Sequence, residues 1–144
     1  MSLLTYHKIT HSDQKTREEL SFIYQMPDVK RFLHIGEHYF DYVTNTENVF
    51  FYQVEKGGTA IGTLHIEIGE DTISLAILVF PAFQSRGWGT RIITDIKNDV
   101  FGFGCKRIEA YVDPQNKKAV HLFHKSEFSV TTQEDMLLFV YSKS

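Results

Sequence analysis

The sequence contains very little cysteine, and this scarcity excludes two classes of small protein. Cys105 is the single cysteine in 144 residues, so neither an intramolecular disulfide framework nor a zinc site with several cysteine ligands can form. The residue lies in Gly-Cys-Lys directly before an apolar strand, where a small buried side chain is a better interpretation than a nucleophile. We therefore expect a reducing compartment.

Long hydrophobic runs and a large excess of one charge are also absent. No apolar stretch approaches the roughly 18 to 20 residues that span a bilayer, and the first residues lack the architecture of a signal peptide. The net charge is −3 with histidine neutral, and the lysines and arginines are scattered. We expect a soluble cytoplasmic protein with no membrane or nucleic-acid partner; whether the chain forms a homodimer stays open.

The sequence does have the composition of a globular domain, with 42% hydrophobic and 14% aromatic residues. We expect a single domain over residues 1–144, organised around the segment 72–101. Thr72 to Val79 predicts a central strand buried on both faces, and Pro81 ends it because proline has no N–H to donate. The apolar spacing from Trp88 to Val100 then predicts an amphipathic helix.

The turn between this strand and this helix is a predicted anion site. The first turn of a helix has backbone N–H groups without intrahelical partners and carries the positive end of the helix dipole. Gly87 and Gly89 have no Cβ, so a phosphate could approach the backbone closely, and Arg86 and Arg91 add positive charge. A pyrophosphate fits this turn better than a single carboxylate, although neither nucleotide-binding glycine motif matches the spacing.

Two segments carry a resemblance to a known family. The sequence Gln84-Ser85-Arg86-Gly87-Trp88-Gly89 resembles motif A of the GNAT superfamily of N-acetyltransferases, and Leu78-Val79-Phe80-Pro81 is similar to the strand end that precedes it. The run Asn116-x-x-Ala119-x-x-Leu122-Phe123-His124-Lys125-Ser126-Glu127-Phe128 resembles motif B. The two motifs have the family's separation, and the order of elements matches over nearly the whole chain.

This resemblance implies an α/β (or α+β) fold, with a mixed, mostly antiparallel twisted sheet, helices on both faces and a splayed central strand pair. It implies acetyl-CoA as co-substrate and no metal. The pantetheine arm would pair with backbone between the strands that splay, and the pyrophosphate would bind the amides of residues 85–90. The implied cofactor-binding residues are Ile77, Leu78, Val79, Gln84, Ser85, Arg86, Gly87, Trp88, Gly89, Thr90, Asn116 and Phe123.

The sequence differs from the family at the positions that often carry the catalytic acid and base. Direct attack of an amine on a thioester needs a base for the amine and an acid for the departing thiolate. The motif B tyrosine that often serves as the acid is replaced by Phe123. Two positions where relatives often carry a carboxylate base hold Ile73 and Tyr111.

Several substitutes are available on the strands. Tyr111 could be the acid, and Glu109, which shares its strand face, could be the base. Glu67 and His65 could instead relay a proton through water. Each of these side chains could equally be an ordinary exposed strand residue.

The remaining periodicity predicts helices over about 13–25 and from Val29 to Ile35, with Gly36 as the stop of the second. Residues 37–45 could be a helical turn or an ordered loop. A hairpin turn at Lys56 to Thr59 joins a strand over 49–54 to one over 60–68, whose alternation predicts one core face and one polar face. Further elements are expected at 3–10, 107–113, 116–125, 128–130 and 136–141.

The sequence gives the least information about the acceptor substrate. Aromatic and histidine residues are dense between Asp28 and Thr46 and could line an acceptor pocket, although helix packing explains them better. His34 and His38 have a spacing compatible with a metal, but no third ligand suggests itself. Three functions are open: an N-acetyltransferase acting on a primary amine of a small molecule or protein, an acyl-CoA-binding sensor or regulatory module, and an unrelated α/β interaction domain.

Overall fold

The computed structural model describes residues 4–33 and 35–143. The elements follow the order expected from the sequence, except that three helices instead of two lie between the first and second strands. In chain order they are β1 (Leu4–Lys8), α1 (Gln14–Tyr24), α2 (Pro27–Lys30), α3 (Tyr39–Asn45), β2 (Val49–Lys56), β3 (Thr59–Gly69), β4 (Thr72–Val79), the 3₁₀ helix η1 (Pro81–Phe83), α4 (Trp88–Lys97), β5 (Arg107–Val112), α5 (Lys117–Lys125), β6 (Ser129–Gln133) and β7 (Met136–Ser142).

All seven strands form one sheet in the order β1-β2-β3-β4-β5-β7-β6. Every neighbouring pair is antiparallel except β4 and β5, which are parallel. The helix α4 connects β4 to β5, as a parallel connection requires. The sheet is therefore mixed and mostly antiparallel, which confirms the predicted fold class.

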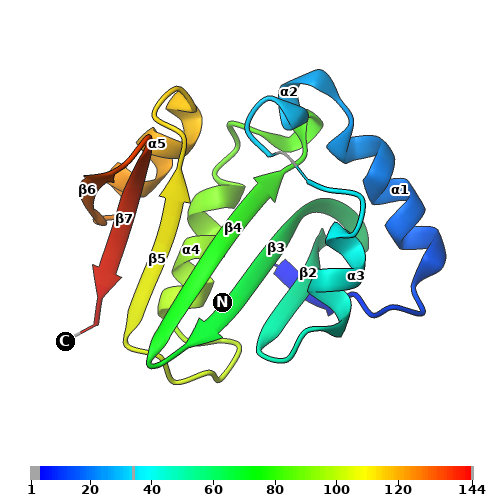
Figure 1. The fold of residues 1–144 in the computed structure, drawn as a ribbon, viewed down its shortest axis with the longest axis horizontal. Helices are drawn as coiled ribbons and strands as arrows, with labels where there is room; N and C mark the ends of the chain where they lie inside the picture. The colour runs from blue at the N-terminus through cyan, green and yellow to red at the C-terminus, as the bar shows by residue number, and fades with distance from the viewer. Residues whose placement is uncertain (1–3, 34, 144) are drawn as a thin grey trace.

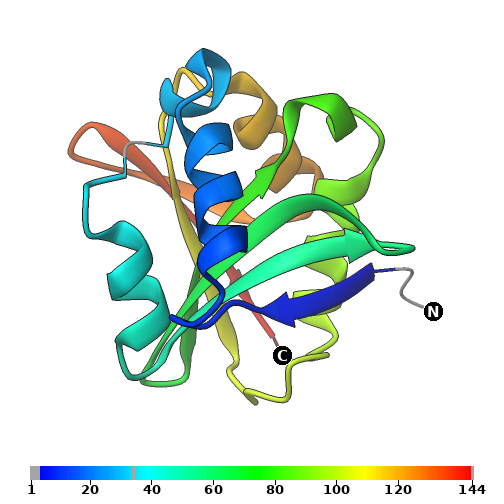
Figure 2. The ribbon, with the colours of Figure 1, turned by 90° about the vertical axis from the view of Figure 1, so that its right-hand side faces the viewer.

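Helices cover both faces of the sheet. Figures 1 and 2 show α1, α2 and α3 on one face, here called the front, and α4 and α5 on the other, the back. The back core includes Ile73, Ile92, Ile108 and Phe139, whereas the front core includes Phe51, Leu78 and Phe80 from the sheet side. Burial of apolar area on both faces drives this three-layer arrangement.

The pairing between β4 and β5 is short. Only Thr72, Ile73 and Ser74 pair with β5, opposite Arg107, Ile108 and Glu109, although β4 continues to Val79 and β5 to Val112. Figure 1 shows the two strands close at one end and diverging towards the other. The predicted splay thus begins directly after Ser74.

Three local expectations differ from the structure. The helix expected from Val29 to Ile35 is only the four-residue α2, whereas the open segment 37–45 forms α3. The β4 strand is not buried on both faces, because Ala76 is exposed where β5 has diverged. The polar face of β3 is covered by the front helices, and Thr63 there is only 2% exposed.

Among the described residues, none of the helices has the length and apolar character needed to cross a membrane.

Candidate active site

The predicted anion turn has the backbone conformation of an anion-binding loop. Gly87 is the N-cap residue of α4 with φ 85°, and Ser85 has φ 62°, so two residues in this short turn adopt the left-handed region. Such conformations direct successive N–H groups into one concave surface. The strain at Ser85, which has a side chain, is typical of a functional turn.

Gln84 fastens this turn to the end of β4. Its Nε2 donates a hydrogen bond of 2.8 Å to the Val79 carbonyl oxygen, and its Oε1 accepts one of 2.9 Å from Lys118 Nζ. The first glutamine of the motif therefore links β4, the turn and α5. Lys118 is a cation beside the turn that the sequence reasoning did not single out.

Gly89 lies close to α5. A Cβ placed there would lie 3.0 Å from Leu122 Cδ2 on α5. A larger side chain at Gly89 would push α5 away as well as crowd a phosphate. A bulky substitution at Gly89 would therefore affect helix packing as well as phosphate access.

A cavity of about 350 Å³ adjoins the turn, lined by Lys56, Thr59, Ile61, Phe83, Arg86 and Trp88. Lys56 Nζ lies 5.2 Å from the centre of the Trp88 ring, a cation–π distance, so two cations border this cavity. Arg91 also interacts electrostatically with Tyr6 of β1: burial and a hydrogen bond to Asp95 raise the pKa of Tyr6, and the Arg91 charge opposes that rise.

The diverging part of β4 offers backbone rather than side chains. Residues 75–79 have no strand partner on the β5 side. Alternate N–H and C=O groups along that edge are available for an extended ligand, except the Val79 carbonyl, which accepts the hydrogen bond from Gln84. The Leu78 side chain is buried in the front core, and Ile77 and Val79 pack against the back core. Ala76 leaves a small exposed floor at the start of the splay.

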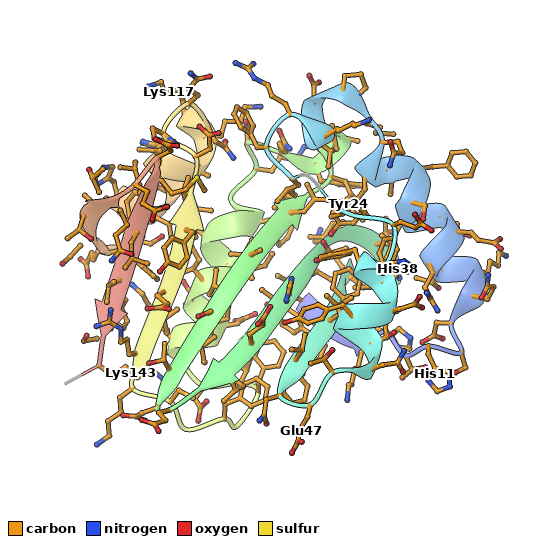
Figure 3. All side chains as sticks on the ribbon, viewed as in Figure 1. His11, Tyr24, His38, Glu47, Lys117 and Lys143 are labelled. Atoms are coloured by element: carbon orange, nitrogen blue, oxygen red, sulfur yellow. The ribbon has the colours of Figure 1, made fainter. Side chains whose placement is uncertain are left out.

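A chain of hydrogen-bonded side chains lies on the front of β3, next to this floor. The Tyr39 hydroxyl is 3.0 Å from His65 Nδ1, and His65 Nε2 is 2.8 Å from Glu67 Oε2. Tyr42 donates to Glu67 Oε1 at 3.0 Å, and the Tyr24 hydroxyl lies 2.8 Å from Thr63 Oγ1. Tyr24, labelled in Figure 3, lies between α1 and the sheet.

Burial and charge set the protonation of His65. Desolvation lowers its pKa below 6.5, and the Glu67 carboxylate only partly opposes that effect, so the imidazole is neutral at pH 7. With Glu67 ionised, Nε2–H donates to the carboxylate, and Nδ1 accepts from the Tyr39 hydroxyl. Burial raises the pKa of Tyr39, which keeps that hydroxyl protonated.

Strand register places Glu67 and His65 close to the splay. His65 lies opposite Ala76, and Glu67 lies opposite Ser74, the last β4 residue that pairs with β5. The His65 side chain is 15% exposed and that of Glu67 is 42% exposed. This pair is therefore in contact with solvent at the point where the two central strands begin to separate.

The two candidates on β5 lie in different settings. Glu109 accepts a hydrogen bond of 3.0 Å from Ser74 Oγ and one of 3.4 Å from Arg107 Nε, so its carboxylate is already paired. Tyr111 lies beyond the last β4–β5 pair, is 53% exposed, and has only a long 3.5 Å contact from its hydroxyl to Gln133. Its hydroxyl is thus directed towards β6, on the side of β5 away from β4.

Two of the residues assigned to the cofactor have structural roles. The Asn116 side chain caps α5 by accepting a hydrogen bond of 3.3 Å from the Ala119 N–H. Phe123 is 4% exposed and stacks on Phe139 at 5.3 Å between ring centres. A hydroxyl at position 123 would be buried in this ring cluster, so restoring the motif tyrosine there would not create a simple proton donor.

Sequence reasoning did not single out Tyr24 and Ala76, whereas Tyr39 belongs to the aromatic segment that could line an acceptor pocket; the fold brings all three to the same front surface. A tyrosine on the buried stripe of a short helix was the available signal for the first. His34 lies outside the described residues, and His38 is a surface residue whose side chain is 81% exposed. Among the residues that the structure describes, no group of three or more metal-ligating side chains is assembled.

Comparison with solved structures finds the same fold in several acetyltransferases. The GNAT domain of S. lividans PAT has a TM-score of 0.77 and 19% identity, covering 95% of this chain and 89% of that one. Campylobacter jejuni N-acetyltransferase PseH in complex with acetyl coenzyme A has a TM-score of 0.74 and 16% identity, covering 99% and 100%. Aminoglycoside acetyltransferase AAC(6')-Ib in complex with coenzyme A and kanamycin has a TM-score of 0.79 and 16% identity, covering 96% and 94%.

These identities are low enough that the structures establish the fold and leave the acceptor undetermined. A comparison with curated protein sequences found no significant match. The model of the acetyltransferase (GNAT) family matches residues 11–128, most of the chain. The chain therefore belongs to the acetyltransferase (GNAT) family.

Proposed function

We propose that this protein transfers the acetyl group of acetyl-CoA to a primary amine. The proposal rests on three features that lie next to one another in the structure. The unpaired edge of β4 leads from an anion-binding turn to the exposed floor at Ala76, and the His65–Glu67 pair lies beside that floor. A ligand with a phosphate at one end and a reactive group at the other matches this line of features.

Two parts of the structure would bind two parts of acetyl-CoA. The amides of residues 85–90 and the cations Arg86 and Lys56 would hold the pyrophosphate, since helix N-termini and nearby cations favour anions. The β4 edge at residues 75–79 would pair with the pantetheine arm by backbone hydrogen bonds. The bound thioester supplies the electrophilic carbonyl carbon near Ala76.

The proton of the acceptor would leave through Tyr39 and His65. The amine nitrogen bonds to the carbonyl carbon and gives a proton to the Tyr39 oxygen, while the Tyr39 hydroxyl passes its own proton to His65 Nδ1. The Glu67 carboxylate stabilises the resulting imidazolium through Nε2–H. The carbon–sulfur bond then breaks, and Tyr111 or water protonates the thiolate.

A binding module without catalysis is the second candidate, favoured by two observations. The Glu109 carboxylate already accepts hydrogen bonds from Ser74 and Arg107, and Phe123, buried in the back core, has no proton to donate. Such a module would bind acetyl-CoA and release no thiol. We also propose a cytoplasmic location, since the single cysteine is buried and unpaired.

Thiol release separates the two candidates. The intact protein is incubated with acetyl-CoA and a panel of primary amines, and free CoA thiol is measured, while calorimetry records acetyl-CoA binding independently. An enzyme shows saturable thiol release that depends on one or more amines. Binding without amine-dependent release over the whole panel would reject the transferase and support the sensor.

A further inference from the structure

A second cavity, of about 210 Å³, opens on the front of the sheet beside the His65–Glu67 pair. Its walls come from α1, the segment between α2 and α3, α3 itself, and the facing strands β3 and β4. The lining residues are Tyr24, Phe32, Leu33, Ile35, Tyr39, Thr63, His65, Ala76, Ile77 and Leu78. The cavity includes Ala76 and Ile77, so it opens onto the diverging edge of β4 where the thioester would lie.

The chemistry of this cavity is apolar with polarity at one end. Most of its lining is aliphatic or aromatic, and the polar groups are the hydroxyls of Thr63 and the two tyrosines and the imidazole of His65. None of the described lining residues is Lys, Arg, Asp or Glu. The nearest carboxylate that contacts the lining is Glu67, at the His65 end.

Volume and charge together restrict what the cavity can hold. A space of about 210 Å³ is smaller than the roughly 300 to 1,000 Å³ typical of pockets for drug-sized ligands. One ammonium can be placed near Glu67, but a second or third would be buried among apolar walls without a partner, which is strongly unfavourable. The aromatic walls favour an apolar or aromatic body.

We propose that the acceptor is a small monoamine with a compact apolar or aromatic body. Its amine lies at the Tyr39–His65–Glu67 end, and its body fills the space between Tyr24, Leu33 and Ile35. The proposal rests on the acetyltransferase function and specifies the substrate class of that site. It distinguishes this site from one built for polycations or for a lysine within a protein.

The test compares acceptors that differ in one property. Steady-state kcat/KM with acetyl-CoA is measured for a series from ethylamine to hexylamine, for 2-phenylethylamine, and for 1,6-diaminohexane, spermidine, kanamycin and a lysine-containing peptide. Each methylene that enters the cavity should raise kcat/KM about fourfold until the space is full. Hexylamine should exceed 1,6-diaminohexane at least tenfold, because they differ in a second ammonium only.

A variant with a negative charge in the cavity wall tests the same preference from the side of the protein. Leu33 is half-buried in the cavity lining, so Leu33→Glu supplies a partner for the second ammonium without removing a core residue. The preference for hexylamine over 1,6-diaminohexane should fall at least tenfold in this variant. Val130→Glu, an exposed change on β6, should leave the preference unaltered.

Each outcome bears on a different statement. Apolar monoamines as the best acceptors, with the Leu33→Glu shift, support the substrate class. A preference of the unmodified protein for spermidine, kanamycin or the peptide overturns the class and leaves acetyl transfer standing. Calorimetric binding of acetyl-CoA without thiol release for any amine overturns the transferase proposal and this class together.

Discussion

His65 owes its proposed role to its neighbours on both ring nitrogens. Tyr39 and Glu67 fix which nitrogen accepts and which donates, and burial keeps the ring neutral near pH 7. A neutral imidazole with an adjacent carboxylate is suited to take up a proton transiently. This arrangement gives His65 a distinct pH signature.

The pKa of His65 lies below 6.5, mainly because burial disfavours the charged form. Turnover at saturating amine should therefore fall as the pH drops below 6.5 and the ring becomes protonated. Glu67→Gln removes the charge that raises this pKa, so the acid limb should move to lower pH while turnover decreases. His65→Gln should lower kcat roughly 100-fold and abolish the limb.

The measurement is kcat as a function of pH for the parent and both variants. His121→Gln, a change at an exposed histidine of α5, serves as the control and should leave the profile intact. An unchanged acid limb in His65→Gln would assign the limb to another group and remove His65 from the proton path.

Tyr111 carries the other residue-scale prediction. Its exposed side chain lies past the last β4–β5 pair, and turning its hydroxyl away from Gln133 on β6 would bring it towards the departing thiolate. A CoA thiol with a pKa near the cysteine reference of ~8.5 is a moderate leaving group. Tyr111→Phe should consequently lower kcat by about 10- to 100-fold with little change in acetyl-CoA affinity.

Steady-state kinetics and calorimetry on Tyr111→Phe test this, with Tyr52→Phe as a tyrosine control on the back of β2. If Tyr111→Phe turns over as fast as the parent protein, Tyr111 is an ordinary strand residue and water is the acid.

Glu127 shows how a departure from the family motif is accommodated at a single residue. Motif B commonly has glycine at this position, and Glu127, which follows the C-cap residue Ser126 of α5, has φ 69°. The left-handed conformation explains why glycine is common there, since a side chain is strained in that region.

At the scale of elements, the contact between α4 and α5 depends on the missing side chain of Gly89. A Cβ at Gly89 would meet Leu122 at 3.0 Å. Gly89→Ala should lower the free energy of unfolding by about 1 kcal/mol, because overpacking outweighs the gain in helix propensity. In a Leu122→Ala background the same change should be neutral or stabilising.

Urea unfolding of the four proteins in this double-mutant cycle measures the coupling, which should exceed about 1 kcal/mol. Additive effects of the two substitutions would show that Gly89 and Leu122 do not compete for the same space, and would leave phosphate access as the reason for the glycine.

Elements with strong local signals were predictable from the sequence. The hairpin glycines Gly57 and Gly58 have positive φ, as expected, and the helix after the glycine turn begins at Trp88. The helices between Met26 and Thr46 could not be predicted in the same way, because Pro27 and the short apolar stripes left their lengths undetermined. The sequence offered His65 and Glu67 as a proton relay, but it could not show that Tyr39 contacts His65, because the two residues are 26 positions apart.

At the scale of the whole molecule, the sheet is a continuous scaffold with one gap. Three residue pairs hold β4 and β5 together, and the two strands then diverge over the rest of their length. The anion turn lies at the far end of β4 on one side of this gap, and the acceptor cavity opens at its start. The cofactor and the acceptor would thus approach Ala76 from different directions.

Amide hydrogen exchange with and without acetyl-CoA tests this account most directly. We predict protection of the amides of residues 85–90 and of alternate amides in residues 75–79, saturating with the calorimetric affinity, and no change in β6. Saturable binding of acetyl-CoA that leaves both segments unprotected would contradict the assignment of the cofactor to the opening between β4 and β5.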